Sequence, residues 1–158
     1  MSSISSANHR ESSDSSSEQL LEELLQVRDD PRSWIERRLY IVTKDSGMQL
    51  LRFNAAQLKY YQSRTLRGII LKPRQVGFTS LICALSLADC LLRPNRVCGI
   101  AAHNAESAQR IFGIVRLMWA RMPAPWHRRY PTQLDNKGEI LWSGLNSRVF
   151  VGSAGSPG

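Results

Sequence analysis

The sequence predicts an α/β fold in which helices flank a parallel sheet. Short apolar runs at residues 68–71 and 97–102 have the length and composition of buried strands. Each run is followed, after a short connection, by a longer segment with apolar residues at helical spacing, residues 79–92 and 105–122. Strands that alternate with helices over short connections are typical of parallel sheets with crossover helices.

Further elements are predicted on both sides of this stretch. Residues 39–43 and 48–53 are strand-like and surround a turn at residues 44–47, which predicts a hairpin or at least two extended segments. Asn54 and Asn104 have side chains suited to cap a helix. Asn54 precedes a helical segment at residues 55–64, and Asn104 precedes the one at residues 105–122.

Near the C-terminus, residues 139–142 and 148–151 predict two more strands, joined by a turn at residues 144–146. A Gly- and Ser-rich segment, residues 152–158, follows them.

The N-terminal region differs from the body in composition. Residues 1–17 are Ser-rich and too poor in apolar side chains to bury a core, so we expect a disordered leader. Residues 18–30 place leucines at helical spacing between acids, which predicts a short amphipathic helix. We expect this helix to stop near Pro31 and to dock on the body or on a partner.

Charge is unevenly distributed over the 158 residues. The net charge is −5 for residues 1–30, +6 for residues 31–71 and +7 for residues 72–158, which together give +8. A basic body behind an acidic leader suits a polyanionic partner such as DNA, RNA or nucleotide phosphates. The alternative is that the excess arginines only solvate the surface.

The cysteines and the hydropathy point to a reducing compartment. Cys83, Cys90 and Cys98 fit no metal-ligand spacing, and the first two lie seven residues apart on one helix face as small buried side chains. The sequence has neither a run of eighteen apolar residues nor an apolar leader, so we expect no membrane span or secretory signal and a cytoplasmic protein.

The junction between residues 68–71 and 79–92 is a candidate phosphate site, because a helix N-terminus after a Gly-containing turn offers backbone N–H groups to an anion. The standard phosphate loop is Gly, four residues, then Gly-Lys-Ser/Thr. Gly77 matches the second Gly, and Thr79 matches the hydroxyl residue that would hold Mg²⁺. Lys72 replaces the first Gly, and Phe78 replaces the usual Lys.

A cation is still needed near the β- and γ-phosphates. Lys72 and Arg74 lie at the front of the same turn, and either could replace the missing lysine. The alternative is that both side chains only face solvent.

The run Arg74-Gln75-Val76-Gly77-Phe78-Thr79, with Lys72 before it, resembles the deviant phosphate loop of the large terminase subunit of tailed bacteriophages. In that family the lysine is commonly moved to the start of the loop. The resemblance covers residues 31–158, the front part of the N-terminal ATPase domain. It implies a P-loop NTPase-like (RecA-like) fold and an ATP-binding role in a viral DNA-packaging motor, in which ATP hydrolysis is coupled to translocation of double-stranded DNA.

The resemblance also implies cofactors and partners. The cofactors are ATP and Mg²⁺. The partners are double-stranded DNA, the small terminase subunit and the portal protein, in the cytoplasm of a bacterial host cell, and self-association into a homo-oligomer is compatible with it. The nucleotide-binding residues that it implies are Gln57, Lys72, Arg74, Gln75, Val76, Gly77, Phe78, Thr79 and Ser80, with Thr79 also at the metal.

Two flanking segments agree with the resemblance. Residues 53–57 are similar to the adenine-recognition segment that terminases share with helicases, in which the Gln57 amide would read the adenine edge. Residues 100–112 are similar to the strand-to-helix segment after the phosphate loop. His103 at its strand end would contact nucleic acid or a neighbouring motif, or only cap the turn.

One departure from the family concerns catalysis. A motor ATPase needs an apolar strand that ends in Asp-Glu, to order Mg²⁺ and to activate water. No such pair follows the phosphate loop, and Asp135 and Glu139 lie in polar, turn-like surroundings. We therefore expect a truncated frame or fragment whose sheet is incomplete at the C-terminus, whose catalytic residues are unknown, and which hydrolyses ATP poorly or not at all.

Three other hypotheses remain open. A helicase-like ATPase shares the glutamine and the phosphate loop, although helicases normally keep the loop lysine. A basic nucleic-acid-binding module without nucleotide chemistry would use the eight cations of residues 31–71, interleaved with aromatic rings. An inactive prophage remnant is the third. The rings of the second hypothesis are Trp34, Tyr40, Tyr60 and Tyr61.

Overall fold

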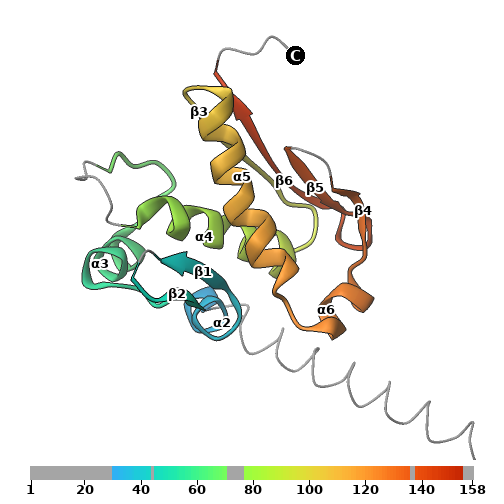
Figure 1. Ribbon diagram of the computed structural model, residues 1–158, viewed down its shortest axis with the longest axis horizontal. Coiled ribbons are helices and arrows are strands. Elements are labelled where there is room, and N and C mark those ends of the chain that lie inside the picture. Colours follow the sequence, from blue (N-terminus) through green and yellow to red (C-terminus); the bar gives the residue numbers. More distant parts are fainter. Residues whose placement is uncertain (1–29, 44, 71–76, 136–137, 155–158) are drawn as a thin grey trace, which may run out of the picture.

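The computed structural model describes residues 30–43, 45–70, 77–135 and 138–154 of the chain. Over these residues the fold is α/β, with helices packed on a four-stranded sheet (Figure 1). The described elements in chain order are α2 (Pro31–Arg38), β1 (Tyr40–Thr43), β2 (Gly47–Leu50), α3 (Ala55–Ser63), α4 (Phe78–Leu92), β3 (Val97–Ala102), α5 (Ala105–Ala120), α6 (Ala124–Arg129), β4 (Thr132–Asp135), β5 (Glu139–Trp142), the 3-10 turn η1 (Ser143–Leu145) and β6 (Ser147–Ser153).

The sheet is mixed, which corrects the predicted parallel sheet. Its strand order is β3-β6-β5-β4, and only β3 and β6 run parallel. Strands β4, β5 and β6 pair as antiparallel neighbours. The reason is the length of the connections, because a few residues can join antiparallel strands, whereas a parallel pair needs a crossover of a dozen or more residues. Here α5 and the elements after it make the one long crossover, from β3 to β6.

Helices α4 and α5 pack on one face of β3 and β6. Residues of β6 alternate strictly, with Val149 and Val151 buried under the helices and Arg148 and Phe150 exposed on the other face. Val97 of β3 is 58% exposed on that second face. Helices α4 and α5 therefore cover one face of this part of the sheet.

The hairpin and the helix after it were predicted correctly. Strands β1 and β2 pair antiparallel, with Tyr40 opposite Leu50. Helix α3 begins after Asn54, whose side-chain oxygen accepts a hydrogen bond from the backbone N–H of Gln57 at 2.9 Å. That bond satisfies one of the N–H groups that the first turn of a helix leaves unpaired.

The predicted strand at residues 68–71 is wrong over residues 68–70, which have no regular structure, and Leu71 lies outside the described residues. A strand exists only where a neighbour accepts its ladder of hydrogen bonds, and the edge of β3 away from β6 pairs with no described strand. Ile69 is 92% exposed, so the apolar run does not pack as a buried strand there.

The core of the described residues joins the first helix to the sheet. Trp34 of α2 packs edge-to-face on Trp126 of α6, with ring centroids 5.3 Å apart. Trp119 of α5 packs in the same way on Trp142 of β5, also at 5.3 Å. Contacts of this kind add about 0.5–1.5 kcal/mol each to the burial of the rings.

Candidate functional site

Helix α4 begins at a glycine with a left-handed backbone. Gly77 is the N-cap residue, with φ +72° and ψ +11°. Residues with a Cβ rarely adopt this conformation, and a Cβ placed on Gly77 would lie 2.9 Å from Nε2 of Gln57. The position therefore requires glycine twice over, for its backbone angles and for the close approach of Gln57.

Gln57 connects α3 to the start of α4. Its Nε2 donates to the carbonyl oxygen of Gly77 at 2.9 Å, and its Oε1 accepts from the backbone N–H of Asn54 at 2.9 Å. The Gly77 carbonyl also accepts the first helical bond of α4, from Leu81 at 3.1 Å, so both of its lone pairs are used. Gln57 is only 3% exposed.

These contacts give Gln57 a structural role that the sequence did not reveal. Asn54 and Gln57 form a reciprocal capping box, each side chain bonding the backbone N–H of the other. The spacing of the two residues could have predicted the box. The Gln57 amide donates one N–H to Gly77 and accepts from Asn54 with one lone pair. Its second N–H and its second lone pair remain for a ligand.

The first turn of α4 offers backbone N–H groups to an anion. Among the described residues no side chain caps this helix, and its N–H groups at Phe78, Thr79 and Ser80 precede the first helical bond. The helix is 15 residues long, so its N-terminus carries the partial positive charge of the aligned peptide dipoles. Thr79 is exposed on this turn.

Phe78 is a buried packing residue. It is 7% exposed and packs edge-to-face on Tyr60 of α3, with ring centroids 5.7 Å apart. The residue at the usual lysine position therefore fixes α4 against α3 and brings no charge. The predicted residues Lys72, Arg74, Gln75 and Val76 lie outside the described residues.

A cavity of about 200 Å³ adjoins this turn. Its lining comes from α4, β3, α5 and the irregular segment before α4, and it is apolar apart from the hydroxyl of Thr79. The residues that line it are Ile70, Phe78, Thr79, Ile82, Cys83, Ile100 and Ile111. The first turn of α4, which is the candidate anion site, therefore borders an apolar cavity.

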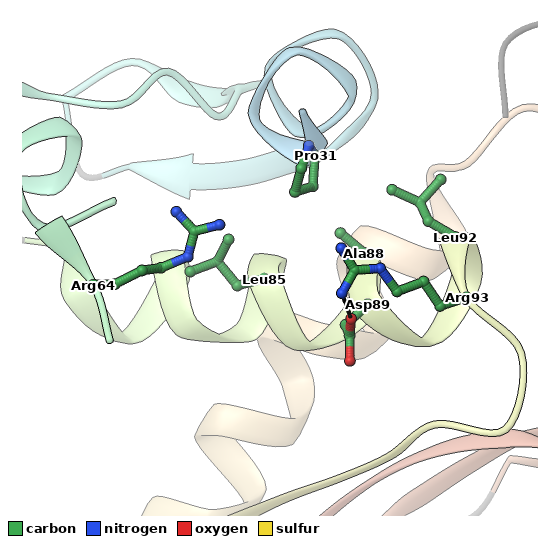
Figure 2. A pocket seen from close by; sticks show the side chains of 7 residues that line it. All are labelled: Pro31, Arg64, Leu85, Ala88, Asp89, Leu92 and Arg93. Carbon is green, nitrogen blue, oxygen red and sulfur yellow. Dashed lines mark hydrogen bonds and ion pairs between the residues drawn. The ribbon is translucent and has the colours of Figure 1, made fainter. Parts of the chain in front are cut away.

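A second cavity, of about 220 Å³, lies beside the later part of α4, between Pro31 and Arg64 (Figure 2). Its α4 lining begins at Leu85, eight residues or about 12 Å along the axis from Gly77. Asp89 lines it and pairs with Arg93 at 3.3 Å. Its wall carries two arginines, Arg64 and Arg93, beside this one carboxylate, and its distance from Gly77 makes the cavity separate from the candidate phosphate site.

His103 follows the last residue of β3, as predicted. Its Nε2 lies 3.5 Å from Oγ of Ser107, which also accepts from Arg110 at 3.0 Å. Asn104 caps α5 by accepting from the N–H of Ser107 at 2.8 Å. The cap is therefore Asn104, and His103 is exposed beside an arginine at the carboxyl end of β3.

Residues that could hold Mg²⁺ are few. The parts of the chain that the structure describes contain no group of three His, Cys, Asp or Glu side chains suited to a metal. Magnesium is often bound by one or two protein oxygens together with phosphate oxygens, and the exposed Thr79 hydroxyl fits such a role. Glu139 pairs with Arg148 at 3.3 Å, which places that carboxylate in a strand-to-strand ion pair.

Comparisons with known proteins add no family to this picture, because no protein-family model matches the chain and no curated protein matches it. Within the described residues, none of the helices has the length and apolar character to cross a membrane. Fold and site together define an α/β protein in which α4 begins at a left-handed glycine and no described side chain caps it.

Proposed function

We propose that the start of α4 binds the phosphates of ATP, and that the chain is the ATP-binding portion of a DNA-packaging motor of the terminase large-subunit kind. The observation that carries the proposal is the hydrogen bond from Gln57 to Gly77. The resemblance implies that both residues contact the nucleotide, although twenty positions separate them in the chain. In the structure a hydrogen bond of 2.9 Å joins them.

Each residue would have a separate task. The N–H groups of residues 78–80 would bind phosphate oxygens, and Lys72 or Arg74 would supply the charge that Phe78 lacks. The Thr79 hydroxyl would contribute one oxygen to Mg²⁺, which neutralises phosphate charge when bound. Because Gln57 is buried and already bonded on both sides of its amide, we propose that it mainly positions Gly77, and that it reads adenine only through its remaining N–H and lone pair.

Hydrolysis is not part of the proposal for this chain alone. Strands β3, β4, β5 and β6 end in Ala102, Asp135, Trp142 and Ser153. The residue after Asp135 is Asn136, so no described strand after α4 ends in the Asp-Glu pair that a motor ATPase requires. We therefore propose binding of ATP with little or no turnover. Double-stranded DNA, a small terminase subunit, a portal protein and further copies of the chain are the proposed partners of the assembled motor.

The test is calorimetric titration of the whole chain with ATP and Mg²⁺. Replacing the phosphate-contacting cation should weaken binding at least about tenfold, because one charge-assisted contact contributes about 1.5–3 kcal/mol. Lys72→Ala and Arg74→Ala are tested separately, to assign that role. Lys59→Ala removes an exposed cation of α3 and is the matched control, with unchanged affinity. No ATP binding by the folded chain would refute the proposal.

A second candidate is a basic nucleic-acid-binding module without nucleotide chemistry, favoured by the net charge of +8. The structure removes part of its expected binding face, because Trp34 is 1% exposed and packs in the core. Tyr60 packs on Phe78 and Tyr61 packs on Phe53. DNA binding that falls with salt and ignores ATP and Mg²⁺ would favour this candidate over the first. Phe78 at the lysine position still disfavours a helicase-like ATPase.

A further inference from the structure

Two of the three cysteines lie side by side where α4 packs on the sheet. The sequence predicted Cys83 and Cys90 on one buried helix face, and in the structure Cys98 of β3 is the neighbour of Cys90. The backbone supports this placement independently. The Cys90 thiol donates to the carbonyl oxygen of Arg148 at 3.3 Å, and its sulfur lies 3.8 Å from the carbonyl oxygen of Arg96, two residues before Cys98. Val149, which follows Arg148, is the register partner of Cys98.

The two thiols differ in exposure and in acidity. Cys90 is fully buried and Cys98 is half-buried. The neighbouring Cys90 side chain lowers the pKa of Cys98, helped by Arg96 and Ser86 and opposed by burial and by Asp89. The same contact and burial raise the pKa of Cys90. Cys98 is therefore the more nucleophilic member of the pair, and Cys90 is the protonated neighbour held against it.

We propose that Cys90 and Cys98 are a modification site for hydroperoxides, at which oxidation converts the two thiols to a reversible disulfide between α4 and β3.

The chemistry balances over two steps. The Cys98 thiolate attacks one oxygen of hydrogen peroxide, which forms the S–OH bond, breaks the O–O bond and releases hydroxide that takes up a proton as water. The Cys90 sulfur then attacks the Cys98 sulfur, loses its proton, and displaces hydroxide, which leaves as a second water. The two thiols supply two electrons, and peroxide accepts both.

Cys83 provides a control within the chain. It lies two turns earlier on α4, is fully buried, and contacts the carbonyl oxygen of Ile111 at 3.9 Å. Burial raises the pKa of Cys83 to about 12, so it stays protonated at neutral pH. We expect Cys98 to react with peroxide at least about tenfold faster than Cys83 in the folded chain.

The test is peroxide treatment of the folded chain, followed by mass spectrometry without reduction. The expected product has lost about 2 Da, as two thiols do on forming a disulfide, and dithiothreitol restores the starting mass. Trypsin cleaves after Arg96, which separates Cys90 from Cys98, so the disulfide appears as two linked peptides. Because Cys83 and Cys90 share one tryptic peptide, the Cys83→Ser variant assigns the bond.

Cross-linking that survives in Cys83→Ser and disappears in Cys90→Ser and Cys98→Ser supports the proposal. Cross-linking that survives in Cys90→Ser, or oxidation of Cys98 to sulfinic acid without a disulfide in the unmutated chain, overturns it. The unmutated chain and Cys83→Ser alone decide the matter if either of the other variants does not fold. In urea, where folding no longer holds the pair together, the preference for Cys90–Cys98 should vanish.

Discussion

Gly77 combines a left-handed backbone with a carbonyl that accepts from both Gln57 and Leu81. Gly77→Ala should lower the free energy of unfolding by about 1–3 kcal/mol, because it strains the backbone and pushes Gln57 aside. Gly113→Ala is the matched control. Gly113 lies inside α5 with open space around it, so alanine there should raise stability by about 0.5–1 kcal/mol. Equal effects of the two changes in urea unfolding would contradict this account of Gly77.

Gln57 is expected to matter for stability as well as for nucleotide binding. Gln57→Ala removes the bond to Gly77 and half of the capping box, so we expect a loss of about 1–3 kcal/mol. Gln62→Ala, at an exposed site in the same helix, should change stability by less than about 0.5 kcal/mol. Thermal melting of the two variants measures the difference. A Gln57 variant as stable as the Gln62 variant would show that the bond to Gly77 contributes little.

Burial of Cys83 makes the free energy of unfolding depend on pH. Its pKa is raised to about 12 in the folded chain, from 9.0. Above pH 9 the unfolded chain loses the thiol proton while the folded chain keeps it, so the free energy of unfolding falls as pH rises toward 12. The loss reaches up to about 1.4 kcal/mol per pH unit. In Cys83→Ala, urea unfolding from pH 9 to pH 10 should show a shallower decrease, and parallel curves would exclude this contribution.

Helices α3 and α5 show how well local signals worked at the scale of the element. Asn54 and Asn104 were recognisable as caps, and both helices begin directly after them. Helices α2 and α6 were missed, because each has at most eight residues and a proline in its first turn. Such short helices depend on burying Trp34 and Trp126 together, which is a tertiary contact that no local pattern shows.

The cap of α5 can be tested directly. Asn104→Ala removes the bond to the N–H of Ser107 and should cost about 1 kcal/mol. Gln109→Ala, at an exposed position of the same helix, keeps the cap and should be nearly neutral. Denaturant unfolding of both variants measures the difference, and equal midpoints would mean that α5 does not depend on its cap.

The candidate site was predictable in part. Gly77 and Thr79 lie at the start of a helix as expected, but the role of Phe78 as a packing residue against Tyr60 was not foreseen. Comparison with the standard phosphate loop shows which residues of this turn differ in type. The comparison does not show where the Phe78 side chain points, because that depends on the position of α3, which begins at its own capping box.

At the scale of the whole molecule, the sequence predicted an α/β architecture but not its sheet. Alternation of apolar strands and helices was visible, whereas the pairing of strands far apart in the chain was not. Strand β6 lies between β3 and β5, parallel to β3 and antiparallel to β5. Partner choice of this kind is set by the packing of α4 and α5 on β3 and β6 together, which is a property of the assembled fold.

Phosphate binding at the first turn of α4, as proposed above, can be measured residue by residue. The direct measurement is a backbone amide NMR titration of the ¹⁵N-labelled chain with ATP and Mg²⁺. We predict that the largest shift changes occur at Phe78, Thr79 and Ser80, with smaller changes at Gly77 and in the side-chain amide of Gln57. No shift changes at these amides, or changes confined to the cavity beside residues 85–93, would contradict the claim.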